Sequence, residues 1–340
     1  MRIVIPEGAE FVPEPQHLEP LRRLGELVIV PGAPRDKADL IARVKDADVV
    51  ILDYSLMDAE VLAACPRLRL IAFLGLGYAS CVDVEAATRQ GIVVTNTPDY
   101  GATSVAEHAL GLVLALTRHI AASSASLRAG RWEPGRFQGM ELRGKTLGVV
   151  GLGGIGREMA RLGAGIGMEV IGWTRRATPD RAVHGLRLVP LETLMAAADV
   201  VSLHLVLEPG TRGLVSRALL QRMRPTAYFV NTARAGIVDN AALLDLIRAG
   251  RIAGAAFDVF DEEPLPPDDP WRDLPTILVT PHIGYNTREA SLNMLNIAIA
   301  TVQAHLRGER LHVVNPEAAD AADRPPADHR RKLDGPKSLR

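Results

Sequence analysis

The sequence has few cysteines, few aromatic residues and no excess of charge of one sign, and each shortage excludes a class of protein. Two cysteines in 340 residues, Cys65 and Cys81, cannot make a disulfide framework or a four-cysteine zinc site. An aromatic content of 4% argues against a base-stacking surface. With 39 Lys+Arg and 40 Asp+Glu the net charge is -1, so no field of one sign is available to hold nucleic acid or an anionic membrane.

Long uninterrupted hydrophobic runs are also missing. The most apolar stretch, residues 105–117, contains Glu107 and His108 and is too short to cross a bilayer, so we expect a buried helix there. At the N-terminus Pro6 and Glu7 interrupt the apolar run too early for a signal peptide, which predicts a cytoplasmic protein. No group of His, Cys, Asp and Glu has the spacing of metal ligands, so no metal site is expected.

What the sequence does contain is a repeated alternation of short apolar runs with helix-like segments. Four such runs lie in the first hundred residues and six more lie between residues 146 and 284. Because these runs are continuously apolar, we expect strands buried on both faces, as in parallel α/β sheets. The length corresponds to about two domains. Beyond Pro316 the chain is polar and aperiodic, which predicts a disordered tail over residues 317–340.

The strongest single motif is a glycine loop at residues 151–156. Gly151, Gly153 and Gly156 follow an apolar run directly and open a helix-like segment. This is the context in which such glycines allow a tight turn, let the backbone approach a pyrophosphate and present a helix N-terminus to its charge. The sequence therefore predicts a dinucleotide-binding domain.

The end of the second strand of that domain bears on the choice of cofactor. Thr174 stands where an acidic residue would bind the ribose hydroxyls, and Arg175 and Arg176 follow it. An uncharged hydroxyl beside guanidinium groups suits a 2′-phosphate better than a free hydroxyl, so NADP(H) is expected in preference to NAD(H). The alternative is that the two arginines lie on a solvated loop.

Three polar residues follow later apolar runs: Arg234, Glu263 and His282. Ligands of open α/β sheets bind at the carboxyl ends of the strands, so these side chains could converge on one crevice. A histidine can pass a proton to or from a hydroxyl, a carboxylate can hold its ring, and an arginine can bind a carboxylate and polarise a carbonyl. The set suits the interconversion of a ketone and a secondary alcohol. Five other histidines are expected on the surface or in packing: His108, His119, His184, His305 and His312.

Several stretches together resemble one family, the D-isomer specific 2-hydroxyacid dehydrogenases, which include phosphoglycerate, glyoxylate/hydroxypyruvate and phosphite dehydrogenases. The stretches are VVGLGGIG, SVAEH, DVVSLHLVLEPGTRGLV, MRPTAYFVNTARAGIVD, GRIAGAAFDVFDEEPLP and TPHIGYNT. The resemblance implies that His282 is the general acid/base, Glu263 its orienting partner and Arg234 the group that binds the substrate's carboxylate and carbonyl. It also implies a small anionic 2-keto or D-2-hydroxy acid as substrate.

The resemblance further implies the domain arrangement and the remaining site residues. A Rossmann domain, residues 100–286, is expected to be inserted into a flavodoxin-like substrate domain, residues 1–99 plus 287–316. Substrate contacts are expected from Leu76 and Gly77 in a glycine turn and from Tyr100. The expected cofactor contacts are Gly151, Gly153, Gly154, Ile155, Gly156, Thr174, Arg175, Arg176, His204, Thr211, Thr232, Ala233, Asp258, His282 and Gly284.

The resemblance leaves three hypotheses of function, the first of which includes the assembly. The first is hydride transfer between NAD(P)(H) and C2 of a 2-keto or 2-hydroxy acid, by a homodimer whose connecting loop is exchanged around residues 131–145. The second is phosphite oxidation, since Glu263 disfavours only the formate-oxidising relatives, which pair the histidine with glutamine. The third is a nucleotide-sensing protein like the corepressors that resemble this family, because those can retain the same three side chains.

Overall fold

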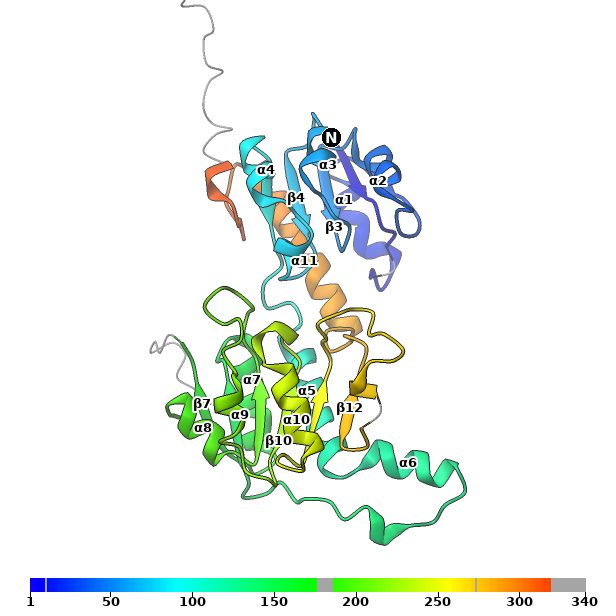
Figure 1. Ribbon diagram of the computed structural model, residues 1–340. Helices are drawn as coiled ribbons and strands as arrows, with labels where there is room; N and C mark the ends of the chain where they lie inside the picture. Colours follow the sequence, from blue (N-terminus) through cyan, green and yellow to red (C-terminus); the bar gives the residue numbers. More distant parts are fainter. Residues whose placement is uncertain (10, 176–185, 273, 319–340) are drawn as a thin grey trace, which may run out of the picture. The chain divides into compact units, whose positions relative to one another are not determined.

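The computed structural model describes residues 1–9, 11–175, 186–272 and 274–318, and these form two compact units (Figure 1). The five-stranded unit comprises Met1–Tyr100 and the chain from Ser291 onward, and the seven-stranded unit comprises Gly101–Ala290. The corresponding sequence prediction placed the boundaries at residues 99/100 and 286/287. The predicted fold class, two parallel α/β sheets, is confirmed.

The five-stranded unit is a parallel sheet with strand order β2-β1-β3-β4-β5. Four of its strands are strongly apolar and one, β2, is only partly buried at the edge of the sheet. Its strands are β1 (Arg2–Ile5), β2 (Glu26–Ile29), β3 (Val49–Leu52), β4 (Leu70–Phe73) and β5 (Val93–Thr95). Its helices are α1 (Glu19–Arg22), α2 (Lys37–Val44), α3 (Ala59–Ala63), α4 (Val84–Arg89) and most of α11 (Arg288–Leu306).

Every residue of β3 and β4 is buried, because helices cover both faces of this sheet. One face packs against α2, α3 and α4, and the other packs against α11 through Met294, Leu295 and Ala298. Capping carboxylates fix where these helices begin: Asp36 accepts the backbone N–H of Asp39, and Asp58 those of Glu60 and Val61.

The seven-stranded unit is a parallel sheet with strand order β12-β11-β10-β9-β6-β7-β8. Its strands are β6 (Thr146–Val150), β7 (Glu169–Trp173), β8 (Arg187–Leu188), β9 (Val200–Leu203), β10 (Tyr228–Asn231), β11 (Gly254–Phe257) and β12 (Ile277–Val279). Its helices are α5 (Ala102–Thr117), α6 (Ile120–Arg128), α7 (Gly154–Gly165), α8 (Leu191–Ala197), α9 (Arg217–Leu220) and α10 (Asn240–Arg248). Strands β7 and β8 lie on one side of β6, and the next strand in the sequence, β9, lies on its other side. This reversal of strand order at β6 is the Rossmann pattern.

Two strands and one boundary differ from the sequence prediction. The edge strands β2 and β8 were missed, because β2 is only partly buried and β8 has two exposed residues. The five-stranded unit also continues past residue 316: Ala318 is fully buried in its core, and its N–H donates to the carbonyl of Asn315. Residues 319–340, which the prediction assigned to a disordered tail, lie outside the described residues.

None of the described helices is by itself long and apolar enough to span a membrane. The helices α5 and α6 pass that test only as a pair, and they are bent by 59° between Thr117 and Ile120. The helix expected over residues 105–117 is part of α5, and it packs through Ala106, Ala109 and Val113 into the core of the seven-stranded unit.

Candidate active site

The three predicted catalytic residues follow three adjacent strands. Arg234 lies three residues after β10, Glu263 lies six residues after β11, and His282 lies three residues after β12. Because β10, β11 and β12 are parallel neighbours, their carboxyl ends share one edge of the sheet. The register of the seven-stranded sheet therefore brings the segments that carry these side chains to the same edge.

His282 and Glu263 form a close pair. His282 Nδ1 lies 2.7 Å from Glu263 Oε2, and Glu263 Oε1 accepts the backbone N–H of Phe260 at 2.8 Å. The carboxylate is thus anchored on one oxygen and faces the imidazole with the other. Each side chain is about one-third exposed, 37% for His282 and 36% for Glu263. The pair is fixed in orientation yet open to a small molecule.

A cavity of about 710 Å³ lies beside this pair. Its lining is mostly apolar, with the imidazole and the carboxylate among its polar groups. The lining residues are Phe260, Glu263, Pro264, Leu265, Arg272, Val279, Thr280, Pro281 and His282. Arg272 is occupied by the carbonyls of Leu265 and Pro266, so it holds the wall of the cavity together.

Arg234 stands apart from the pair. Its Nη1 donates to the carbonyl of its own neighbour Ala233 at 2.6 Å, and the side chain is exposed. Within the described residues it has no hydrogen bond or ion pair with Glu263 or His282. The structure brings two of the three predicted residues into contact and leaves the third directed at its own backbone.

The glycine loop has the geometry that a dinucleotide requires. Gly151 has φ +100°, and a Cβ there would lie 2.3 Å from the carbonyl oxygen of His204. A Cβ on Gly156 would lie 1.8 Å from the carbonyl oxygen of Gly151. Gly153 differs: it precedes the first residue of α7, Gly154, and a Cβ there would meet nothing within 4 Å. Two glycines are needed by the fold itself, and the third faces open space at a helix N-terminus, where a phosphate binds.

Two buried polar atoms without a partner lie after β9 and β10. They are His204 Nδ1 and Thr232 Oγ1, for which the described chain offers no hydrogen bond. Burial lowers the pKa of His204 to about 3, so its ring is neutral, and Nε2 is hydrogen-bonded to Ser202 Oγ at 2.8 Å. Buried polar groups need partners, and a bound dinucleotide offers them beside the glycine loop. The residues present therefore fit the cofactor.

Asp258, at the end of β11, is buried and accepts several hydrogen bonds. Thr280 Oγ1 donates to it at 2.6 Å, the backbone N–H of Ile283 at 2.9 Å and that of Gly284 at 2.7 Å. His108 Nε2 lies 3.4 Å from the same carboxylate. The sequence prediction placed His108 among surface or packing residues, and the structure adds its contacts with Thr280 and Asp258. The histidine is distant in sequence from the motif residues that it contacts, and its only sequence signal was that a polar side chain interrupts a buried helix.

The sequence comparisons decide the family. Residues 110–284 match the NAD-binding domain of the D-isomer specific 2-hydroxyacid dehydrogenases. The chain belongs to this family. The resemblance drawn from its motifs is thereby confirmed.

Relatives within the D-isomer specific 2-hydroxyacid dehydrogenases have different names. A D-3-phosphoglycerate dehydrogenase from Mycobacterium bovis is 43% identical over 282 residues, which are 82% of this chain and 53% of that protein. A glyoxylate reductase from Korarchaeum cryptofilum is 38% identical over 82% of this chain and 85% of its own length. An NADPH-dependent glyoxylate/hydroxypyruvate reductase from Sinorhizobium meliloti superposes with a TM-score of 0.80 at 31% identity, over 93% of this chain and 98% of that one.

The chain spans about half the length of the phosphoglycerate dehydrogenases that it matches. It corresponds to nearly the whole of the two reductases.

Of the three residues predicted to select between NADP(H) and NAD(H), the structure describes Thr174 and Arg175. Arg175, at the end of β7, forms an ion pair with Glu208, which lies beyond β9. Thr211 Oγ1 accepts the N–H of Glu208 and donates to the carbonyl of Val206, which stabilises the same loop. Arg176 lies outside the described residues.

The predicted substrate turn lies in the five-stranded unit, after β4. Gly75 has φ +132°, and its N–H donates to Thr97 Oγ1 at 2.7 Å. The backbone N–H groups of Leu76 and Gly77 donate to nothing in the part of the chain that the structure describes. Tyr100 packs at the edge of the core formed by β1, β3 and α11. The turn thus offers two backbone donors.

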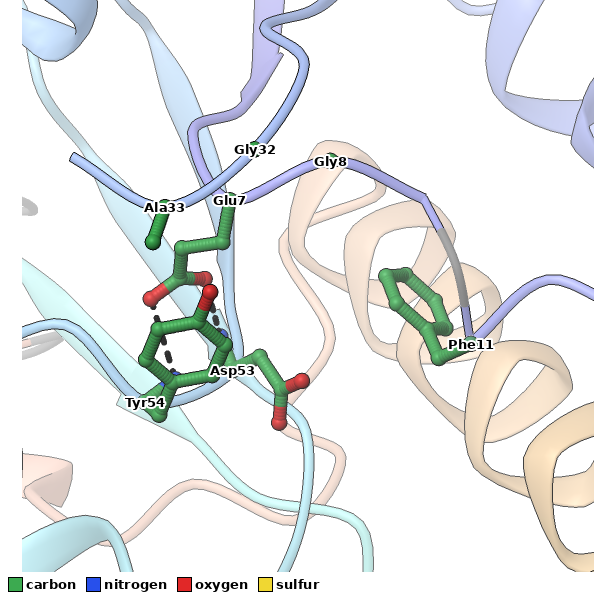
Figure 2. Close-up of a pocket in the computed structure, with 7 residues that line it drawn as sticks. All are labelled: Glu7, Gly8, Phe11, Gly32, Ala33, Asp53 and Tyr54. Atoms are coloured by element: carbon green, nitrogen blue, oxygen red, sulfur yellow. Dashed lines mark hydrogen bonds between the residues drawn. The ribbon is translucent and has the colours of Figure 1, made fainter.

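A second cavity, of about 240 Å³, lies at the carboxyl ends of β1, β2 and β3 (Figure 2). Its lining contains two carboxylates and no basic side chain: Glu7, Gly8, Phe11, Gly32, Ala33, Asp53 and Tyr54. Glu7 is buried and accepts the backbone N–H groups of Asp53 at 2.7 Å, Tyr54 at 3.0 Å and Ser55. Burial and the charge of Glu7 raise the pKa of Asp53 to about 6. In the described residues no three His, Cys, Asp or Glu side chains gather as metal ligands.

Proposed function

We propose that the chain is an NAD(P)-dependent 2-keto acid reductase that interconverts a small 2-keto acid and a D-2-hydroxy acid, with His282 as general acid/base. The observation that carries the proposal is the His282–Glu263 pair at 2.7 Å, which opens on a large cavity at the carboxyl edge of a dinucleotide-binding sheet. The names of the glyoxylate reductase relatives support the same reaction class.

The pair determines which nitrogen of His282 does the chemistry. Because a carboxylate only accepts hydrogen bonds, Nδ1 carries a proton and donates it to Glu263, so Nε2 is the atom that serves the substrate. Glu263 stabilises the imidazolium, from which Nε2 gives its proton to the carbonyl oxygen of the keto acid. A nicotinamide, when bound, supplies the hydride for C2. In the oxidation direction Nε2 takes the hydroxyl proton instead.

The substrate carboxylate is assigned to Arg234. The family resemblance predicts separately that the backbone N–H groups of Leu76 and Gly77 bind an anion. An arginine binds a carboxylate through two parallel hydrogen bonds, and its present bond to the Ala233 carbonyl is easily exchanged because the side chain is exposed. The two backbone donors bind anions without a counter-charge to desolvate. Arg234 also stabilises the negative charge that develops on the carbonyl oxygen.

Among keto acids we propose an unphosphorylated substrate of the glyoxylate or hydroxypyruvate class. Two relatives that the chain matches over 85% and 98% of their own length are named for the reduction of glyoxylate or hydroxypyruvate. This favours the activity of the reductase relatives over that of the longer phosphoglycerate dehydrogenases.

The cofactor proposed is NADP(H) in preference to NAD(H), on the basis of Thr174, Arg175 and the NADPH named for the Sinorhizobium meliloti relative. The ion pair between Arg175 and Glu208 limits that preference, since the carboxylate competes with a 2′-phosphate for the guanidinium.

We also propose a cytoplasmic homodimer held through α6 and the segment that follows it. In Figure 1 this part extends from the seven-stranded sheet. Three large apolar side chains on it are exposed, Ile120 by 54%, Leu127 by 56% and Trp132 by 82%. A patch of this kind favours a partner of similar surface. Sedimentation equilibrium of the wild-type chain and of Trp132→Ser tests the assembly.

The decisive experiment measures initial rates with glyoxylate, hydroxypyruvate, pyruvate, phenylpyruvate, phosphohydroxypyruvate and phosphite, each with the appropriate NAD(P) form. We expect reduction of the small unphosphorylated keto acids, and loss of turnover with retained cofactor binding in His282→Asn, since asparagine tolerates the left-handed φ of +53°. Turnover of phosphite alone would instead favour a phosphite dehydrogenase. Tight cofactor binding without any turnover would favour a nucleotide sensor.

A further inference from the structure

His108 lies where three segments of the seven-stranded unit meet. It stands in the second turn of α5, between the core residues Ala106 and Ala109, and α5 packs against β10, β11 and β12. Its side chain is 21% exposed. Nε2 lies 3.1 Å from Thr280 Oγ1 and 3.4 Å from Asp258 Oδ1. A polar side chain on the inner edge of a core helix is thus directed at the loop that carries His282.

The hydrogen bonds around Thr280 determine that Nε2 of the His108 ring carries a proton. Thr280 Oγ1 lies 2.6 Å from Asp258 Oδ1, and since the carboxylate only accepts, the threonine hydroxyl uses its single proton there. Toward His108 the same oxygen can act only as an acceptor. His108 Nε2 therefore carries a proton and donates it to Thr280 and Asp258.

Asp258 restrains the chain on both sides of His282. Thr280 precedes His282 by two residues, and the N–H groups of Ile283 and Gly284 follow it directly. Burial alone would raise the pKa of Asp258, but hydrogen bonds from His108, Thr280 and the two backbone groups outweigh it and hold the pKa below its usual value. The carboxylate is therefore charged and accepts all of these donors at once.

The restraint matters because of the conformation at its centre. His282 has φ +53°, which costs energy for a residue with a side chain and persists only where the surroundings impose it. The packing is also close: a Cβ on Gly284 would lie 2.9 Å from Asp258 Oδ2 and 3.3 Å from His108 Cδ2.

We propose that His108 is a positioning residue for His282, acting through Thr280 and Asp258 to hold the turn of residues 280–284. The inference rests on the proposed function, in which His282 transfers the proton. His108 itself touches neither Glu263 nor His282 among the described contacts. Its effect is on the alignment of the imidazole with Glu263 and hence on kcat rather than on substrate affinity.

The test compares His108→Leu, which removes the donor, with His108→Gln, which retains an N–H donor on a side chain of similar reach. We expect the leucine variant to lower kcat about tenfold with KM changed less than about twofold, corresponding to roughly 1.4 kcal/mol of lost alignment. The glutamine variant is expected to recover most of the loss. Thr280→Val, which removes the bridging hydroxyl at nearly constant volume, should behave like the leucine variant. His305→Leu, at a half-buried histidine of the five-stranded unit, is the matched control.

Hydrogen exchange of the segment 279–286 in the cofactor-bound protein gives a readout that does not depend on turnover. The leucine variant should exchange the Ile283 and Gly284 amides faster, with the rest of the seven-stranded unit unchanged. Unchanged exchange and kcat in that variant, or a glutamine variant as impaired as the leucine one, would overturn the proposal. If the wild type reduces no keto acid but the exchange effect appears, the proposed function fails and the positioning role stands.

Discussion

The charge of Glu263 should contribute to the rate at which the protein reduces keto acids. Glu263→Gln retains the oxygen that accepts the Phe260 N–H and removes the negative charge 2.7 Å from His282 Nδ1. A buried charge-assisted hydrogen bond contributes about 1.5–3 kcal/mol and an exposed ion pair about 0.2–1 kcal/mol. Since both side chains are about one-third exposed, we take about 1 kcal/mol for this pair.

The direction of the change follows from the reaction. Proton transfer from Nε2 needs the positively charged ring in place, and the carboxylate stabilises and orients that form, so its loss should lower the rate of reduction. At about 1.36 kcal/mol per tenfold change in rate, kcat for reduction should fall about fivefold. The assay is the initial rate of glyoxylate reduction at saturating cofactor.

Glu262→Gln is the matched control for this experiment, because it removes the same charge from an exposed neighbouring residue. The control should leave kcat as it is in the wild type. A kcat that does not fall in Glu263→Gln, or that falls equally in Glu262→Gln, refutes the assignment of Glu263 as the partner that stabilises the imidazolium.

Three further variants test other parts of the structure. Gly153→Ala should leave the melting temperature unchanged yet weaken cofactor binding by about tenfold or more, since the added Cβ meets only the space assigned to the pyrophosphate. Glu208→Gln, by freeing Arg175, should raise the ratio of kcat/KM for NADPH over NADH about two- to fivefold. Asp53→Asn should become more stable relative to the wild type as the pH rises from 4 to 7, by roughly 2 kcal/mol in urea unfolding. The reason is that the pKa of Asp53 is about 6 when folded and 3.8 in its ordinary state, so ionisation opposes folding.

For each of these three predictions, one experimental outcome would contradict the reasoning. Gly165→Ala, also at an open position of α7, is the control for the glycine variant, and equal cofactor affinity in the two would remove the assignment of Gly153. An unchanged cofactor ratio in Glu208→Gln would show that Arg175 does not face the 2′ position. A stability difference for Asp53→Asn that is the same at pH 4 and pH 7 would contradict the effect of burial on that carboxyl.

The sequence predicted the parts of this protein that depend on continuous local patterns. Buried strands such as β3 and β4 are apolar at every position, and a glycine loop between a strand and a helix has one common structural meaning. The strand-end rule predicted that Arg234, Glu263 and His282 could converge, and the family resemblance supplied the pairing of Glu263 with His282. In contrast, β2 and β8 lie at sheet edges where one-sided burial leaves a weak pattern.

Local sequence patterns could not predict contacts between residues that are distant in the sequence. His108 and Asp258 are 150 positions apart, and only the packing of α5 on β11 brings them together. The same holds for the ion pair of Arg175 with Glu208, which qualifies the cofactor preference drawn from the arginine alone. Local patterns identify which groups can do chemistry, whereas tertiary packing determines which of them already have a partner.

The discontinuous five-stranded unit has a consequence for the order in which the chain folds during synthesis. Its core is incomplete until Met294, Leu295 and Ala298 of α11 arrive, and the N–H of Val94 finds its acceptor, the Asn315 side chain, only near residue 315. The seven-stranded unit contains its whole core within residues 101–290 and is complete earlier. Of the two units, the five-stranded one thus begins earlier in the chain and closes its core later, and in the interval its apolar strands are exposed to chaperones and proteases.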